Sequence, residues 1–193
     1  VIGMLGILEQ IEKAVGSRVK ASGEVLLLVG PMSDDLGGSQ YLQNRLGRPA
    51  GDAPEFSLDV ERSVQKAVLA CIEAGFVSAA HDVSDGGLAV TLIEMVLDAA
   101  CLGLDVSFAA GPGQRMDGLL FGEAQSRIVI AARPENAGPV EEMCRQAGVE
   151  VRKIASVTET GRFRVNETVM DLSVEELKRA YSNAIPALMA NEL

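Results

Sequence analysis

Hydrophobic residues along this chain occur either in short continuous runs or at helical spacing, and the two patterns alternate. Short apolar or alternating runs bounded by turn residues predict strands at residues 24–29, 102–108, 127–132, 149–157 and 162–165. Apolar spacing and end signals predict helices at residues 57–74, 88–99, 134–147 and 174–189. This order of elements predicts an α/β (α+β) fold in which helices flank a mixed β-sheet.

Capping residues define two of the expected helix starts. Ser39 is expected to cap a short helix that continues to about Arg45, because a serine hydroxyl accepts a hydrogen bond from a free first-turn N–H. Ser173, with Glu176 three residues later, predicts a capping box at the start of the last helix. No internal repeat or linker interrupts the pattern, so the 193 residues are expected to form one domain.

The composition of the chain argues against some classes of binding partner and indicates a cellular compartment. The formal net charge is −10 and the chain has no basic cluster, which argues against nucleic acid or an anionic membrane as the main partner. No apolar run approaches the roughly 18 residues that cross a bilayer, and the first residues lack the basic start of a signal peptide. A cytoplasmic protein is expected.

Three cysteines, an odd number, are widely spaced among apolar residues. Cys71, Cys101 and Cys144 are therefore expected to be reduced thiols, with burial expected for Cys71 and Cys101.

The most distinctive segment is residues 81–87, His-Asp-Val-Ser-Asp-Gly-Gly, which contains the only histidine. It lies where a short strand is expected to become a helix, and Ser84 or Asp85 can cap that helix. A helix start attracts phosphate, but Asp82 and Asp85 repel it unless a cation lies between them. A phosphate site bridged by Mg²⁺ satisfies both conditions. The alternative is structural: the two aspartates only cap a helix, and His81 is a turn residue.

Two other groups of residues have the same ambiguity. Gly37, Gly38 and Ser39 can form a backbone nest for an anion, or simply a loop that leads into a helix cap. Glu123 and Gln125 are two residues apart, so in a strand their side chains share a face. That face can contact a metal or substrate, or it can be a polar edge in solvent.

Three segments resemble one known family. Residues 80–90, Ala-His-Asp-Val-Ser-Asp-Gly-Gly-Leu-Ala-Val, are similar to a signature in the C-terminal half of the phosphoribosylformylglycinamidine synthase family. Residues 34–42 resemble the family's Leu-Gly-Gly-Ser-Glu-Tyr-Leu loop, with Gln40 in place of the usual acid. Residues 120–127 resemble its Phe-Ser-Glu-Ser-Gln-Ser-Arg segment. Weaker similarities at residues 1–6 and 171–177 extend the resemblance over almost the whole chain.

The resemblance implies a fold and an activity. The fold is the C-terminal domain of the AIR synthase-related superfamily, an α/β sandwich with partial ferredoxin-like topology that spans residues 1–193. Residues 1–15 are then the tail of a preceding ATP-binding domain. The implied enzyme uses ATP, Mg²⁺ and glutamine-derived ammonia to convert formylglycinamide ribonucleotide into formylglycinamidine ribonucleotide. Its implied partners are the upstream ATP-binding domains and a glutaminase subunit or domain.

The resemblance also implies roles for individual residues. Metal contacts are implied for Asp82, Asp85 and Glu123. Nucleotide or phosphate contacts are implied for Gly37, Gly38, Ser39, His81, Ser84, Gly86, Gly87 and Gln125.

No catalytic base is expected in this chain. Phe56 replaces a family glutamine and Ala124 a family serine, so this half lacks substrate contacts. The isolated chain is therefore expected to fold but to be inactive. Two other functions stay open: a module that only holds nucleotide or braces an assembly, and a domain of a different ATP-dependent enzyme of the superfamily.

Overall fold

A single seven-stranded sheet organises the chain in this computed structural model, which describes residues 3, 6–8, 10–99 and 101–190. The strand order is β2-β4-β1-β5-β3-β6-β7. The strands are β1 (Val25–Val29), β2 (Val77–Asp82), β3 (Gly103–Val106), β4 (Ile128–Ala132), β5 (Val151–Thr158), β6 (Arg162–Val165) and β7 (Met170–Ser173). Within the described residues β3 and β6 pair in parallel and the other neighbours are antiparallel, so the predicted mixed sheet is confirmed. Most of the similarity at residues 1–6 lies outside the described part of the chain.

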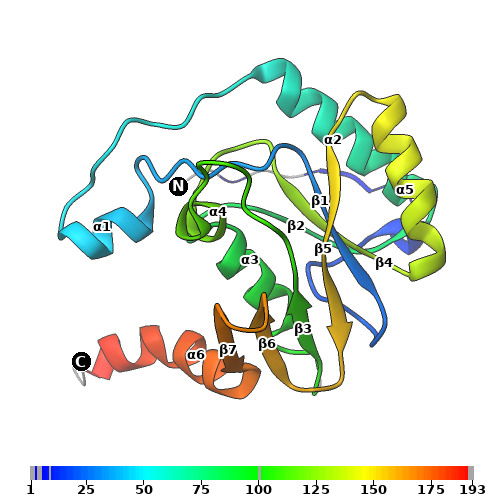
Figure 1. The fold of residues 1–193 in the computed structure, drawn as a ribbon. Coiled ribbons are helices and arrows are strands. Elements are labelled where there is room, and N and C mark those ends of the chain that lie inside the picture. The colour runs from blue at the N-terminus through cyan, green and yellow to red at the C-terminus, as the bar shows by residue number, and fades with distance from the viewer. Residues whose placement is uncertain (1–2, 4–5, 9, 100, 191–193) are drawn as a thin grey trace.

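Helices cover both faces of this sheet (Figure 1). The helices are α1 (Gln40–Leu46), α2 (Leu58–Glu73), α3 (Gly87–Val96), α4 (Met116–Phe121), α5 (Pro134–Gln146) and α6 (Val174–Ala190), with a short 3₁₀ helix η1 (Ile11–Lys13). Helices α2 and α5 pack on one face, whereas α3 packs on the other with α4 and α6 against it.

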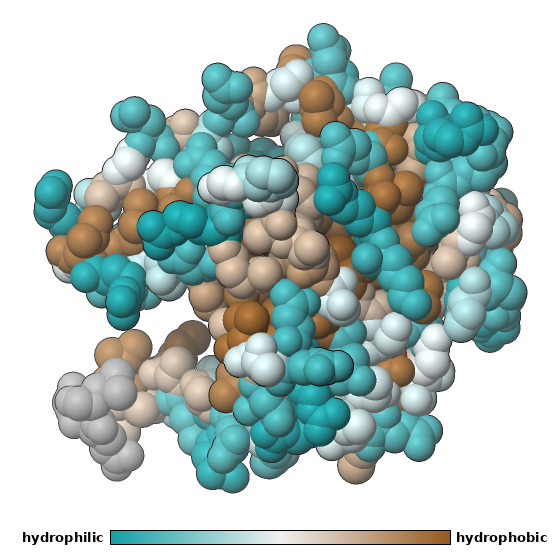
Figure 2. All heavy atoms as spheres, in the orientation of Figure 1, coloured by the Kyte–Doolittle hydropathy of each residue, from teal (hydrophilic) through white to brown (hydrophobic). Residues whose placement is uncertain are grey.

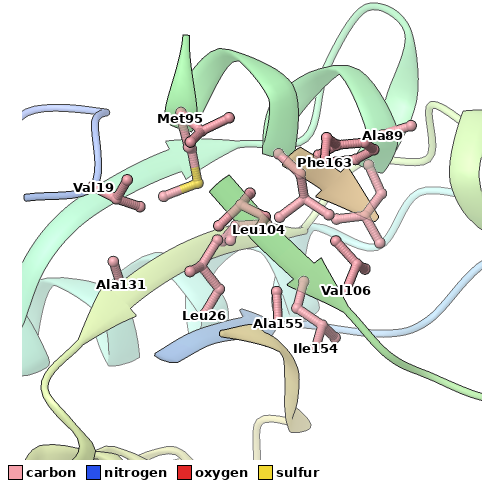
Figure 3. Close-up of a cluster of buried hydrophobic side chains, with 14 of the residues drawn as sticks. Val19, Leu26, Ala89, Met95, Leu104, Val106, Ala131, Ile154, Ala155 and Phe163 are labelled. Atoms are coloured by element: carbon pink, nitrogen blue, oxygen red, sulfur yellow. The ribbon is translucent and has the colours of Figure 1, made fainter. Parts of the chain in front are cut away.

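Two hydrophobic cores follow from the alternation of side chains along β1, all of whose residues are buried. Leu26 and Leu28 point into the core under α3, part of which Figure 3 shows with Met95 and Phe163. Their neighbours Val25, Leu27 and Val29 point into the core under α2 and α5. A strand buried on both faces reads as a continuous apolar run, which is why the sequence located β1 well.

Three elements were not predicted from sequence, of which the shortest is the three-residue 3₁₀ helix η1. Helix α4 is only six residues long, too short to show helical periodicity, although Leu119 and Leu120 are buried. Strand β7 pairs with β6 over Met170–Ser173, where the sequence indicated only the approach to the last helix. The serine half of the predicted capping box is confirmed, because Ser173 Oγ accepts a hydrogen bond from the Glu176 N–H at 3.4 Å. The return bond from the Ser173 N–H to the Glu176 side chain is not among the hydrogen bonds of the described residues.

The cysteines are free thiols, but one is not where it was expected. Cys71 on α2 and Cys144 on α5 are buried between the two helices. The hydrogen bond between them and burial raise the pKa of the Cys144 thiol. The prediction that Cys101 is buried is wrong: it lies exposed in the turn before β3, where its backbone has a φ of 58°.

On the face that Figure 2 shows, hydrophilic side chains surround several groups of apolar ones. Within the described residues, none of the helices combines the length and the apolar character that a membrane span requires.

Candidate functional site

Strand order brings the three resembling segments to one end of the sheet. Strand β4 lies between β1 and β2 and is antiparallel to both, so Val29 and Asp82 both lie opposite Ile128. The C-terminal ends of β1 and β2 and the N-terminal end of β4 therefore lie at the same end of the sheet. Helix α1 follows β1 and helix α3 follows β2, and both start at this end beside α4 (Figure 1). A hydrogen bond from the Val83 N–H to the Arg127 carbonyl at 2.9 Å extends the pairing beyond the strands.

An open pocket of about 530 Å³ lies between this end of the sheet and the start of α2. It is lined by Phe56, Glu61, Gln65, residues 82–85, Glu123 and residues 125–128. Five of the predicted site residues line it together: Asp82, Ser84, Asp85, Glu123 and Gln125. The pocket is therefore acidic.

Glu123 makes the most consequential contacts at this site. Its Oε1 accepts hydrogen bonds from the Gln40 N–H at 2.9 Å and from the Gly86 N–H at 2.8 Å. The prediction that Ser84 or Asp85 caps α3 is wrong, because Gly86 is the cap residue and no local side chain supplies a cap bond. Glu123 and Gln125 also lie in the loop before β4 and not in a strand, so the shared strand face is wrong as well.

The backbone N–H groups of Gly37 and Gly38 in the Gly-Gly-Ser loop already donate hydrogen bonds to other groups of the protein. The Gly37 N–H bonds to Asp35 Oδ1 at 2.8 Å, and the Gly38 N–H bonds to the Ala50 carbonyl at 2.8 Å. The predicted cap is confirmed, since Ser39 Oγ accepts from the N–H of Leu42 at 3.3 Å. An anion at this loop has to displace these internal bonds, and ligand binding by its residues stays a prediction.

In the second glycine pair, Gly87 lies against backbone from elsewhere in the protein, whereas Gly86 lies against the Val90 side chain. Gly86 and Gly87 have φ values of 83° and 71°, in the left-handed region that favours glycine. A Cβ on Gly87 would lie 2.6 Å from the Gly122 carbonyl oxygen and 2.7 Å from the carbonyl carbon of Phe121. The close approach expected for a ligand is thus made by the end of α4.

His81 does not line the pocket itself but contacts a residue that does. Strand β2 continues through Asp82, and the imidazole of His81 stays close to its neighbour, with Nδ1 3.4 Å from Asp82 Oδ1. His81 packs toward α3, with Nε2 3.3 Å from Glu94 Oε2 and Nδ1 2.8 Å from the Asp82 carbonyl oxygen. Its side chain is 18 % exposed, against 71 % for that of Asp82. A contact of His81 with nucleotide stays a prediction.

Arg127 is a site residue that sequence reasoning overlooked. It is 2 % exposed, its Nε donates to the Ala124 carbonyl at 2.9 Å, and its Nη2 donates to the Gly122 carbonyl at 2.7 Å. Burial lowers the pKa of Arg127 to about 10, so the guanidinium stays charged at neutral pH. The sequence signal that could have identified Arg127 is its position as a charged residue directly before a strongly apolar strand.

Comparisons with known proteins agree with this architecture. The family model "AIR synthase related protein, C-terminal domain" matches residues 21–167. The chain is 40% identical over 204 residues to phosphoribosylformylglycinamidine synthase subunit PurL of Symbiobacterium thermophilum, which covers 97% of this chain and 26% of that protein. It is 40% identical over 192 residues to the same subunit of Moorella thermoacetica, and that match covers 98% of this chain and 26% of the relative. The chain thus spans about a quarter of the length of these relatives.

Solved structures share the fold at lower sequence identity. Thermotoga maritima PurL complexed with ADP superposes with a TM-score of 0.71 at 23% identity, covering 87% of this chain and 27% of that one. The hydrogenase maturation protein HypE of Escherichia coli superposes with a TM-score of 0.57 at 20% identity, covering 83% of this chain and 52% of that one. The family match over most of the chain and the shared fold lead to one conclusion: the chain belongs to the AIR synthase related proteins and contains their C-terminal domain.

Proposed function

We propose that this chain is the C-terminal domain of a phosphoribosylformylglycinamidine synthase. The whole enzyme converts formylglycinamide ribonucleotide into formylglycinamidine ribonucleotide with ATP and glutamine-derived ammonia. Its ATP-binding domains and glutaminase lie outside this chain, and residues 1–15 are the tail of the domain before it. The main support is 40% identity to curated PurL subunits over 97% and 98% of the chain. The alternative, a domain of a different ATP-dependent enzyme of the superfamily, has less support because both relatives at 40% identity are PurL subunits.

In this proposal the domain holds nucleotide and supplies no catalytic base. The observation that carries it is the gathering of Asp82, Asp85 and Glu123 around one pocket beside the start of α3. Carboxylates repel a bare phosphate but favour a phosphate with a divalent cation, because the cation neutralises part of the phosphate charge. The occupant of the pocket is therefore the Mg²⁺-bound phosphate end of ATP or ADP.

The donor set fits Mg²⁺ better than a metal that needs a full protein cage. Among the residues that the structure describes, no three His, Cys, Asp or Glu side chains are arranged to hold a metal ion by themselves. Mg²⁺ commonly takes one or two carboxylates and completes its shell with water and phosphate oxygens. Asp82 is the leading ligand because its side chain is 71 % exposed and lines the pocket. Asp85 and Glu123 are the further candidates, and the Gln125 amide can donate to a phosphate oxygen.

Replacement of Asp82 by Asn in the full-length enzyme tests this role. Nucleotide that copurifies with the protein is measured after denaturation, together with the melting temperature and turnover. We expect less bound nucleotide or a lower melting temperature, with turnover within about tenfold, or roughly 1.4 kcal/mol of barrier. Glu141→Gln, at an exposed position on α5, is the control and leaves all three values unchanged. A thousandfold loss of turnover with normal nucleotide and melting temperature would make this half catalytic and overturn the proposal.

The isolated 193-residue chain provides a second test. Its two cores are complete on both faces of the sheet, so we expect it to fold. The proposal places the ATP-binding domains elsewhere, so we expect no ATP-dependent amidine formation. Measurable product from the purified chain contradicts the assignment of roles.

A further inference from the structure

Glu123 joins two helix starts that are far apart in the sequence. The Gln40 N–H is 83 residues away from Glu123 and the Gly86 N–H is 37 residues away, yet both donate to the same carboxylate oxygen. Gln40 is the first residue of α1, and Gly86 is the cap residue of α3. One side chain thus connects the Gly-Gly-Ser loop to the loop that contains Asp82 and Asp85.

The charge of Glu123 suits this position. Helix starts have free N–H groups and a partial positive charge, which an acidic residue in the first turn commonly offsets. Neither α1 nor α3 has an acidic residue in its first turn. Glu123 supplies one carboxylate to both, and hydrogen bonds to an ionised acceptor are stronger than those to a neutral one.

Arg127 fixes the backbone on both sides of Glu123. Its guanidinium donates to the carbonyls of Gly122 and Ala124, the two residues that flank Glu123. The Gly122 position has no room for a side chain, because a Cβ there would lie 2.5 Å from the Asp35 carbonyl oxygen. The carboxylate of Glu123 is therefore presented from a backbone that Arg127 ties on both sides.

We propose that Glu123 is a positioning residue that couples the two glycine-rich loops, and that Arg127 holds it in place. Order gained by one loop is then transmitted to the other through the shared oxygen. Among the described residues Glu123 Oε2 accepts no hydrogen bond, so the coupling leaves one oxygen available at the pocket. A consequence for nucleotide retention rests on the proposed function, whereas the coupling itself does not.

Other contacts keep α1 in place when the carboxylate is removed. The rings of Tyr41 and Phe121 stack with centroids 5.0 Å apart and an interplanar angle of 5°. The Tyr41 hydroxyl also donates to Asp117 Oδ2 at 3.3 Å. Because these contacts tie α1 to α4 independently of Glu123, we expect Glu123 variants to fold.

Hydrogen exchange in the full-length protein tests the coupling, with Glu123→Ala, Glu123→Gln and the control Glu61→Ala. Glu61 lines the same pocket from α2 but makes no hydrogen bond to either loop within the described residues. In Glu123→Ala we expect the amides of both Gln40 and Gly86 to exchange at least tenfold faster. Glu123→Gln keeps a side-chain oxygen that can accept, so it restores most of the protection, and Glu61→Ala changes neither amide.

Two outcomes overturn the coupling: faster exchange at only one of the two amides, or at neither. Glu123→Met separates the acceptor from the side-chain volume, because Met is of similar size but offers no oxygen acceptor. A merely space-filling role would restore protection in Glu123→Met as in Glu123→Gln, whereas the coupling requires that Glu123→Met exchange as fast as Glu123→Ala. Should Glu123→Ala fail to fold, Glu123→Asp, whose shorter side chain cannot reach both amides, replaces it in the same comparison. Copurifying nucleotide is measured on the same samples. Faster exchange at both amides with unchanged nucleotide supports the coupling and counts against the proposed function.

Discussion

The two glycine-rich loops at the pocket lead into helices that are stabilised in different ways. Helix α1 contains no buried residue, and it begins with a local cap from Ser39. Helix α3 has seven buried residues and no local side-chain cap, and Glu123 bonds to its start from another segment. The loop before α1 is therefore held mainly by polar contacts, whereas the start of α3 is held by the hydrophobic core beneath it.

This difference shows which loop can move. Local opening is easiest where few apolar contacts are lost, so α1 can separate from the protein at a lower free energy than α3. Asp82 and Asp85 lie at the end of β2 and in the loop before α3, so two of the pocket's carboxylates lie on the segment that leads into the better-packed helix. The comparison makes four predictions about stability.

The largest expected effect is the loss of core packing under α3. Leu92 is fully buried, so Leu92→Ala should lower the free energy of unfolding by about 2–5 kcal/mol through lost burial and a cavity. Leu42→Ala, at a partly exposed position on α1, should cost less than about 1 kcal/mol. Urea denaturation of both variants measures the difference. Equal costs contradict the claim that the two helices are held differently.

The glycines of the two loops should also differ. Gly38 and Gly87 have nearly the same φ, 70° and 71°, so Ala at either pays about 1–2 kcal/mol for a left-handed backbone. A Cβ on Gly38 meets nothing within 4 Å, whereas one on Gly87 collides with Gly122 and Phe121. Gly87→Ala should therefore cost about 1–3 kcal/mol more than Gly38→Ala in thermal or urea unfolding. If the two variants differ in unfolding free energy by less than about 0.5 kcal/mol, the predicted steric clash between residue 87 and the end of α4 is refuted.

Removal of the local cap should affect α1 alone. Ser39→Ala loses the bonds of Ser39 Oγ to the Leu42 N–H and to the Leu36 carbonyl, and should cost about 1 kcal/mol. Ser84→Ala, in the loop before α3, should change stability by less than about 0.5 kcal/mol because Ser84 is exposed and caps nothing. A larger effect at Ser84 than at Ser39 refutes this assignment of caps.

The smallest effect concerns acid stability where α1 meets α4. Hydrogen bonds from Arg115 are the main cause that lowers the pKa of Asp117 from 3.8 to about 2, and Tyr41 also contributes. An acid whose pKa falls on folding stabilises the fold above its ordinary pKa and loses that contribution as the pH drops toward the lowered value. Asp117→Asn should cost no more than about 1 kcal/mol at pH 7. The difference from the parent protein should fade between about pH 4 and pH 2, and a constant difference over that range excludes Asp117 as its source.

Elements with local signals were predictable from sequence, and those without them were not. Strand β1 and the caps at Ser39 and Ser173 were found because burial on both faces and a capping hydroxyl leave a pattern within a few residues. Helix α4 was missed because it is six residues long, and strand β7 was missed because none of its four residues is buried, so it has no apolar face for the sequence to show. The gathering of Asp82, Asp85 and Glu123 was expected from the family resemblance alone, since local spacing does not give strand order.

By itself the sequence determined the fold class, most helices and strands, and the acidic character of the pocket. The tertiary structure decided how these residues are used. Glu123 caps two helices and His81 contacts Glu94 on α3, while Gly87 leaves room for the end of α4. The physical reason is that a hydrogen bond or close contact across 37 or 83 residues depends on which strands are neighbours. Neighbouring strands are chosen by the packing of the whole core, and a local pattern of residues does not record that choice.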